Sequence, residues 1–205
     1  MKDDKIIEKL RDDEQYYGKF GKKYISNSDI KDLIYDPAQY GAIKKDNENF
    51  VKGRFFHQLI LEPNKAKDFP IVDIKGRNTK AYKTFLEENN LTFALTLDES
   101  KDINDMVDYL LGKDKVLTDL ITGFDAKYEE PAIGRIFGRD FKAKADIINQ
   151  GIVIDLKSTS DIHKFKRSAN IYGYDSQAFI YQTLFGMPMT FVAVGKIRKY
   201  FGKRN

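Results

Sequence analysis

The sequence contains no cysteine among its 205 residues and only two histidines. The missing cysteines exclude disulfide bonds, thiolate nucleophiles, cysteine-based zinc sites and iron–sulfur clusters. Any metal ion would therefore have to be held by oxygen atoms or by imidazole nitrogens.

Long hydrophobic runs are also missing. No segment approaches the roughly 18 consecutive apolar residues that a membrane span needs. The N-terminal residues alternate acids and bases and lack the apolar region of a signal peptide. We therefore expect a soluble, cytoplasmic protein, in a cell or in an infected host, with no membrane partner.

The chain shows no sign of division into several domains. It contains no internal repeat, and no linker rich in Gly, Ser or Pro interrupts it. Its length suits one domain. Residues 1–24 are charged and weakly periodic, so we expect an arm or a frayed helix there and a single domain over residues 25–205.

Apolar residues recur at helical spacing in four segments of the first half, and each spacing predicts a helix. The four segments contain Ile30–Ile34, Phe56–Ile60, Tyr82–Leu86 and Ile103–Leu110. Pro37 and Pro63 are expected to end the first two helices, and Asp98 is the predicted N-cap of the last.

The second half is dominated by β-rich runs. FKAKADII and GIVIDLKS are separated by Asn149-Gln150-Gly151, which predicts a hairpin. The segment DIHKFKRSANIYGY that follows is polar, and we predict no element in it. A helix is predicted from about Ser176 to Phe185, where Gly186 ends it, and MTFVAVG predicts a final strand. Together these elements predict an α/β (α+β) fold with a central mixed β-sheet flanked by helices.

Acids and lysines alternate on both runs of the hairpin. Asp155 and Lys157 stand two residues apart, so a strand would turn both side chains to one face. Asp146 alternates with two preceding lysines in the same way. A turn of two or four residues would set Asp146 opposite Val153 and diagonal to Asp155. A turn of three residues would separate the aspartates unless a bulge intervened.

These residue types suit the hydrolysis of a phosphodiester. That reaction needs a hard cation to neutralise the phosphate and activate a water, together with a positive group near the water. Two carboxylates and a lysine supply this set, and oxygen ligands select Mg²⁺, with Mn²⁺ able to substitute, over zinc. Acids and lysines also alternate on many exposed strands, so this spacing taken alone favours a solvated face.

Further motifs accompany the spacing. In SQAFIYQTLFG, Gln177 and Tyr181 share a helical face, and the pattern resembles the signature of RecB-type nucleases in the PD-(D/E)XK superfamily. The string from FKAKADII to SQAFIY resembles the exodeoxyribonuclease VIII (RecE-like) family, in which a strand ending in Asp, a hairpin, a D-x-K strand and a Q-x3-Y helix follow one another. ISNSDIKDLIYDPAQY and KGRFFHQLILEP are similar to upstream motifs of that family.

The resemblance implies a restriction-endonuclease-like PD-(D/E)XK core and roles for individual residues. The implied metal ligands are His57, Glu130, Asp146 and Asp155. The implied catalytic residues are Asp146, Asp155, Lys157, Gln177 and Tyr181. Lys157 would orient the nucleophilic water or stabilise charge, while Gln177 and Tyr181 would contact a DNA phosphate or position the lysine.

Some of these roles have alternatives. Glu129 can take the place of Glu130, since both stand just ahead of Pro131. An isolated histidine on a helix, such as His57, is otherwise more often a core residue. Tyr181 can simply pack in the core.

The resemblance also implies an activity. We expect a Mg²⁺-dependent DNA exonuclease that resects linear duplex ends or single strands in phage-type recombination or DNA processing, in a bacterial cell or a phage-infected host. A single-strand annealing protein and further copies of the chain are the implied partners. The expected DNA contacts are Lys142, Lys144, Lys164, Lys166, Arg167 and Tyr174. The alternatives are a structure-specific or nicking endonuclease of the same fold, or a non-catalytic DNA-end-binding module.

Overall fold

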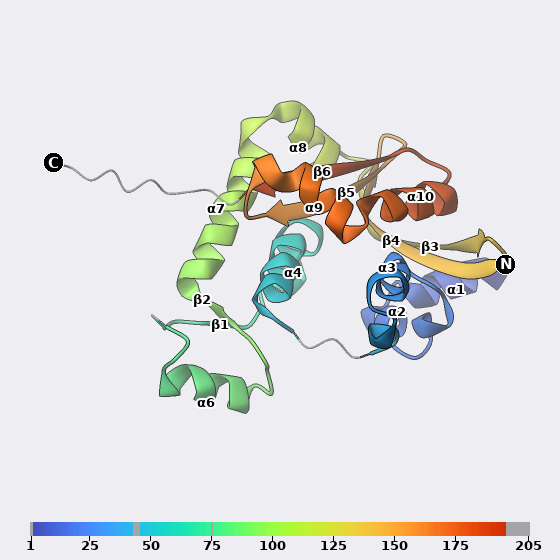
Figure 1. The fold of residues 1–205 in the computed structure, drawn as a ribbon. Coiled ribbons are helices and arrows are strands. Elements are labelled where there is room, and N and C mark those ends of the chain that lie inside the picture. Colours follow the sequence, from blue (N-terminus) through green and yellow to red (C-terminus); the bar gives the residue numbers. More distant parts are fainter. Residues whose placement is uncertain (1, 43–45, 75, 196–205) are drawn as a thin grey trace. The chain divides into compact units, whose positions relative to one another are not determined.

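A computed structural model describes residues 2–42, 46–74 and 76–195 of the chain (Figure 1). The chain forms two compact units. The first unit comprises residues 1–44, 119–156 and 163–192, and the second comprises residues 45–118, 157–162 and 193–205. Two compact units can belong to one domain, so the single domain over residues 25–205 stays a prediction. In the described part of the chain, no helix is long and apolar enough to cross a membrane.

Most of a four-stranded sheet lies in the first unit, with the strand order β3-β4-β5-β6. Its strands are β3 (Lys127–Ile136), β4 (Arg139–Asn149), β5 (Ile152–Thr159) and β6 (Met189–Gly195). The first three pair as antiparallel neighbours, whereas β6 joins β5 only after one short 3-10 helix and two α-helices. A mixed sheet flanked by helices confirms the predicted fold class, and β6 covers the run MTFVAVG as predicted.

Helices cover this sheet from both ends of the sequence. Those that lie in or enter the first unit are α1 (Lys2–Leu10), α2 (Asp13–Tyr17), η1 (Gly21–Lys23), α3 (Asn27–Tyr35), η2 (Pro37–Gln39), α8 (Lys115–Thr122), η3 (Ile162–Lys164), α9 (Phe165–Tyr172) and α10 (Tyr174–Phe185). Helix α10 packs on β3 and β4, and α1 packs on β3. Ile180 of α10 forms a buried cluster there with Ile136 and Phe141.

The segment DIHKFKRSANIYGY, for which no element was predicted, forms η3 and α9. Its lysines and arginine hid a weak helical signal, since Phe165, Ala169 and Tyr172 recur at helical spacing. The next helix, α10, ends at Gly186 as predicted and begins two residues before the predicted Ser176.

The second unit is mainly helical. It contains α4 (Glu48–Leu61), α5 (Pro63–Ala66), β1 (Ile71–Val72), α6 (Lys80–Glu88), β2 (Leu95–Thr96) and α7 (Leu97–Lys113). Helix α4 packs on α7, and β1 pairs with β2 in parallel. The predicted N-cap of α7, Asp98, is wrong. Thr96 caps the helix instead, because its hydroxyl accepts from Glu99 N while the Glu99 carboxylate accepts from Thr96 N.

The turn between β4 and β5 confirms the predicted hairpin. It consists of Gln150 and Gly151, because Asn149 and Ile152 on either side of them already pair. Their φ angles of +50° and +73° are the positive values that a type I′ turn requires at both central positions. The turn therefore holds two residues and sets the register of the whole hairpin.

That register corrects the expected partner of Asp146. Val153 pairs with Ile148 and not with Asp146. Because each step along one strand is matched by a step along the other, continuing the register sets Asp146 directly opposite Asp155. The two aspartates are therefore direct neighbours and not diagonal ones.

Residues 1–24, expected to be an arm or a frayed helix, contribute to the core. Leu10 is 0% exposed and Tyr16 is 6% exposed. A sequence signal for this packing exists, since Ile6, Ile7 and Leu10 form a short apolar stripe on α1. The alternating charges around these three residues masked it.

We predict that Leu10→Ala lowers the free energy of unfolding by about 3 kcal/mol, because the substitution removes a fully buried side chain and leaves a cavity. Urea denaturation followed by circular dichroism measures the loss. Leu33→Ala is the matched control, because Leu33 is 44% exposed and its truncation should cost less than about 1 kcal/mol. Equal stability of wild type and Leu10→Ala would show that α1 is not part of the folded core.

Candidate active site

Two aspartates lie buried where β4 and β5 cease to pair. Asp155 is 3% exposed and Asp146 is 9% exposed. The ladder between the two strands ends one residue short of them. Leu156 N–H donates to Asp146 Oδ2 at 2.7 Å, although the continued register would offer it the carbonyl of Ala145. The Asp146 carboxylate thus takes the place of a backbone acceptor and is held against β5, beside Asp155.

Helix α10 holds the second aspartate. Gln177 Nε2 donates to Asp155 Oδ1 at 2.5 Å. One helical turn later, Tyr181 OH donates to the carbonyl oxygen of Lys144 at 3.1 Å. Burial raises the pKa of Tyr181 well above its ordinary value, and the negative charges of Asp155 and then of Asp146 raise it further. The Tyr181 hydroxyl therefore stays protonated close to both carboxylates.

Gln177 and Tyr181 both lie on α10, one helical turn apart, as their spacing predicted. Their contacts differ from the expected ones. Gln177 contacts a carboxylate, and Tyr181 contacts the backbone of β4. A contact of either residue with DNA stays a prediction.

Strand β5 carries Lys157 two residues beyond Asp155. Alternate residues of a strand point to the same face, so the lysine and the aspartate project from β5 in the same direction. Lys157 is half-buried. Its role as the group that orients water stays a prediction.

Lys142 and Lys144, expected to contact DNA, are buried at 5% and 7% exposure. Both ammonium groups reach the N-terminal segment. Lys142 Nζ donates to the carbonyl of Tyr16 at 2.5 Å, and Lys144 Nζ pairs with Asp13 Oδ1 at 2.6 Å. Each also lies over the Tyr16 ring, at 4.2 and 4.7 Å from its centroid. These contacts tie α2 to β4, and nothing in the local sequence signalled them.

The two glutamates ahead of Pro131 have different surroundings. Glu130 forms a two-pronged pair with Arg11, with both nitrogen-to-oxygen distances at 2.8 Å. Glu129 lies at the position of β3 that the register sets opposite Asp146, between pairs that are formed on either side. Its φ angle is +52°, a value that costs energy for a residue with a side chain. The Glu129 carboxylate lies 3.6 Å from Lys144 Nζ.

His57 lies on α4 in the second unit. It is half-buried, and its ring meets the edge of Phe56 at a centroid distance of 5.7 Å. Phe56 is itself fully buried, and most residues near the histidine on this helix are apolar. Metal ligation by His57 stays a prediction.

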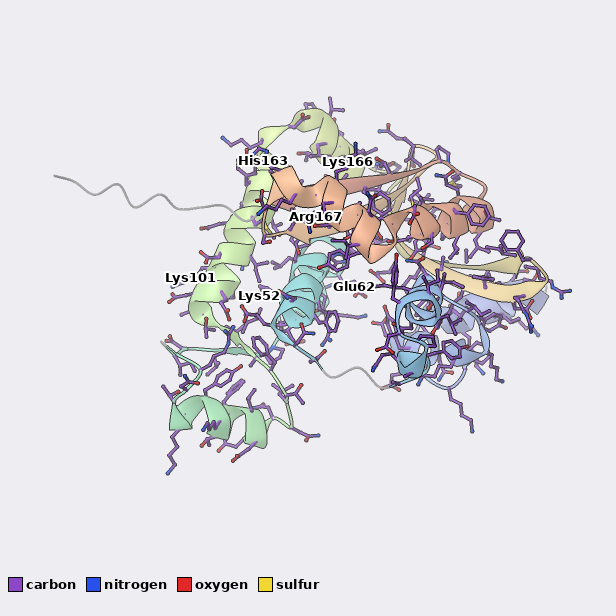
Figure 2. The ribbon with its side chains drawn as sticks, in the orientation of Figure 1. Lys52, Glu62, Lys101, His163, Lys166 and Arg167 are labelled. Carbon is purple, nitrogen blue, oxygen red and sulfur yellow. The ribbon has the colours of Figure 1, made fainter. Side chains whose placement is uncertain are left out.

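Of the remaining expected DNA contacts, three are exposed. Lys164 ends η3, and Lys166 and Arg167 lie on the first turn of α9 (Figure 2). Tyr174 differs from them. Its ring is stacked on Phe191 at 5.1 Å, with an angle of 22° between the planes, so it packs between α10 and β6.

The donor chemistry of the site fits a hard divalent cation. The carboxylates of Asp146 and Asp155 are both buried and both act on the pKa of Tyr181, and carboxylate oxygens are preferred ligands of Mg²⁺ and Mn²⁺. The residues that the structure describes contain no cluster of three or more His, Asp or Glu side chains placed to hold a metal ion. Asp146 and Asp155 are therefore the part of the expected ligand set that the structure brings together.

Residues 27–197 match the family described as a PDDEXK-like domain of unknown function (DUF3799). The chain belongs to this family. The predicted membership of the PD-(D/E)XK superfamily is thereby confirmed. A PDDEXK-like domain supports a nuclease with DNA as its substrate, and such nucleases usually use divalent metal ions.

A solved structure is similar to the fold of this PDDEXK-like chain. It is the crystal structure of a protein from Eubacterium rectale that carries the provisional name exonuclease, with a TM-score of 0.60 and 16% sequence identity. The match covers 90% of this chain and 72% of that chain. At this identity the likeness shows the fold alone. No curated protein matches the chain.

The buried Lys142 predicts a pH dependence of stability. Burial lowers its pKa to about 8; the charge of Asp29 opposes this shift, and that of Lys144 adds to it. Between about pH 8 and the ordinary lysine value of about 10.4, the unfolded chain holds the extra proton, so stability rises with pH in this window. Lys142→Met removes this dependence.

We therefore expect the unfolding free energy of wild type minus that of Lys142→Met to increase between pH 7 and 10, by about 3 kcal/mol at most. Urea denaturation at stepped pH measures the difference. Lys166→Met, at an exposed position, should show a flat difference over the same range. A flat difference for Lys142→Met as well would contradict the lowered pKa.

Proposed function

We propose that this protein is a metal-dependent deoxyribonuclease that hydrolyses DNA phosphodiesters. The observation that carries the proposal is the buried pair Asp146 and Asp155, each held by a hydrogen bond, with Lys157 two residues further on β5. This arrangement occurs in a chain that belongs to a PDDEXK-like family. The arrangement combines two carboxylates that can bind a cation with a lysine that can assist the hydrolysis of a phosphodiester.

We propose that the site binds Mg²⁺, or Mn²⁺ in its place. Asp146 and Asp155 would be the ligands. When bound, such an ion neutralises charge on the scissile phosphate and activates a water. Two buried carboxylates in one site repel each other, and a divalent cation held by Asp146 and Asp155 would relieve this repulsion.

The residues around the aspartates have separate tasks in this proposal. Gln177 fixes one oxygen of Asp155 and so orients the other. Tyr181 anchors the β4 backbone next to Asp146. Lys157 places its ammonium group near the attacking water, where it positions the water and stabilises the negative charge that develops on the phosphate.

Glu129 is our choice for a third ligand, in place of the Glu130 that the sequence favoured. The Glu130 carboxylate is already engaged at both oxygens by Arg11. Glu129 stands opposite Asp146 in the register, in a backbone conformation that is rare for a glutamate. Strained residues of this kind gather at functional sites. His57 stays our proposal for a ligand from α4.

We further propose that the enzyme is an exonuclease that acts on linear DNA ends in phage-type recombination or DNA processing. The RecE-like order of motifs and the provisional name of the Eubacterium rectale protein support this choice. The exposed Lys164, Lys166 and Arg167 would then contact the DNA backbone. A single-strand annealing protein and a homo-oligomer are the partners that this function would favour, and a cytoplasmic location follows from it.

We predict that the protein degrades linear duplex DNA in the presence of Mg²⁺, leaves covalently closed circles intact, and is inactive in EDTA. Gel electrophoresis of both substrates over time measures this. Cleavage of closed circles would indicate an endonuclease of the same fold, and binding without cleavage in any divalent metal would refute an enzymatic function.

The variants Asp155→Asn and Lys157→Ala control for a contaminating nuclease. Lys157→Ala should lower the rate by on the order of 100-fold or more while it still binds Mn²⁺ and DNA. Asp155→Asn should lower the rate and also weaken Mn²⁺ binding. Wild-type rates in Lys157→Ala would exclude the role given to this lysine.

The two glutamates provide a second, matched test. We expect Glu129→Gln to weaken Mn²⁺ binding, measured by calorimetry without DNA, by on the order of 10-fold, because a charged ligand is lost. Glu130→Gln should leave Mn²⁺ affinity within about twofold of wild type, since its partner is Arg11. The reverse result would restore Glu130 as the ligand.

A further inference from the structure

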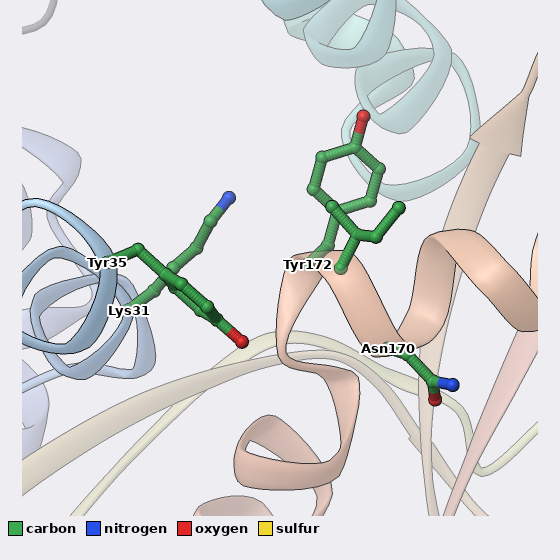
Figure 3. A pocket seen from close by; sticks show the side chains of 5 residues that line it. Lys31, Tyr35, Asn170 and Tyr172 are labelled. Carbon is green, nitrogen blue, oxygen red and sulfur yellow. The ribbon is translucent and has the colours of Figure 1, made fainter.

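A pocket of about 490 Å³ opens between α3 and α9 of the first unit (Figure 3). Its lining residues are Lys31, Tyr35, Asn170, Ile171 and Tyr172. Lys31 and Tyr35 extend from α3, and Tyr172 extends from α9, into the space between the two helices. The volume falls within the range that holds small ligands.

The aromatic rings of this pocket are accessible. Tyr35 is 63% exposed and Tyr172 is 50% exposed, so neither ring is used up in the core. Lys31 Nζ lies over Tyr172 at 4.9 Å from the ring centroid. Accessible tyrosine faces stack on nucleobases of any sequence, a lysine contacts the phosphate backbone, and an asparagine side chain hydrogen-bonds base edges.

The pocket is close to the aspartates along the chain. Tyr172 precedes Gln177 by five residues, which span at most about 18 Å, and Gln177 contacts Asp155. Helix α3 is joined to the start of α10, the helix that follows α9, because Ser176 Oγ donates to Asn27 Oδ1 of α3 at 2.7 Å. A DNA strand advances about 3.4 Å per nucleotide. A base in the pocket would therefore lie within a few nucleotides of the acidic pair.

The outer surface of α9 adds positive charge. Lys166 and Arg167 are exposed and lie one turn before Asn170 and Ile171, which places them beside the pocket lining on the same helix (Figure 2). Helix α9 contains no acidic residue. This charge favours a polyanion over an apolar peptide segment as the occupant.

We propose that this pocket binds an unpaired base of single-stranded DNA within a few nucleotides of the phosphate that is cleaved. The base stacks on Tyr172 and Tyr35, while Lys31 and Arg167 contact the backbone on either side. This inference rests on the proposed deoxyribonuclease function and deepens it: the pocket gives the enzyme a subsite for a frayed or single-stranded end, which a fully paired duplex does not fill.

The test measures binding in EDTA, where no cleavage is expected, with a fluorescent single-stranded oligonucleotide and a blunt duplex of the same sequence. Tyr172→Ala should weaken single-strand binding about 10-fold, the loss of one stacked base, and should change duplex binding less than twofold. Tyr172→Phe should bind like wild type, because the ring face is kept. Tyr109→Ala is the control, since Tyr109 of α7 is 52% exposed and is not one of the residues that line the pocket.

A second experiment tests whether a base occupies the pocket. An oligonucleotide with one abasic position should bind wild type more weakly than the intact strand, and Tyr172→Ala should not distinguish the two. Equal single-strand affinity of Tyr172→Ala and wild type, or equal losses in Tyr172→Phe and Tyr172→Ala, would overturn the pocket proposal. So would a change of oligomeric state in Tyr172→Ala, seen by sedimentation, without a change in DNA binding.

The outcomes for the pocket and for the proposed function are separable. If Tyr172→Ala loses the preference for single-stranded DNA and still cleaves duplex ends in Mg²⁺, both the pocket and the nuclease are supported; if it keeps that preference and still cleaves, only the nuclease is. Wild-type protein that binds neither DNA form and cleaves neither would refute both. Tyr35→Ala, at a still more exposed position, repeats the binding test should Tyr172→Ala unfold.

Discussion

The candidate site depends on one hydrogen bond, from the N–H of Leu156 to the carboxylate of Asp146. A buried N–H must find an acceptor, and a charged acceptor gives the stronger bond. Here the side chain supplies the acceptor in place of the backbone of β4. The Asp146 carboxylate is therefore held against the backbone of β5 at the point where the sheet opens.

An uncharged group donates a hydrogen bond to each of the two aspartates. A main-chain N–H contacts Asp146, and an amide group contacts Asp155. The lysine next to them on β4, Lys144, turns its ammonium group to Asp13 and Glu129 instead. Lys144 thus helps to fasten the N-terminal segment to β4.

The structural features that depend on residues close together in the sequence could be predicted from local patterns. Alternation, helical spacing and turn residues were enough for the hairpin, for α10 and for the shared helical face of Gln177 and Tyr181. Long-range contacts left no local trace. The pair of Arg11 with Glu130 joins residues 119 positions apart, and the burial of Lys144 depends on a helix 131 positions earlier. Helix α9 was missed for a different reason, since its basic surface dilutes the apolar period.

The two-residue turn between β4 and β5 has an evolutionary consequence. Side chains alternate along a strand with a period of two, so one added residue in the turn would rotate every following side chain of β5 to the other face. Asp155 and Lys157 would then leave Asp146 together. Related chains should therefore change the length of this turn in even steps, or carry a bulge in β5 that restores the parity. The number of residues between the two aspartates therefore decides whether their side chains share one face of the sheet.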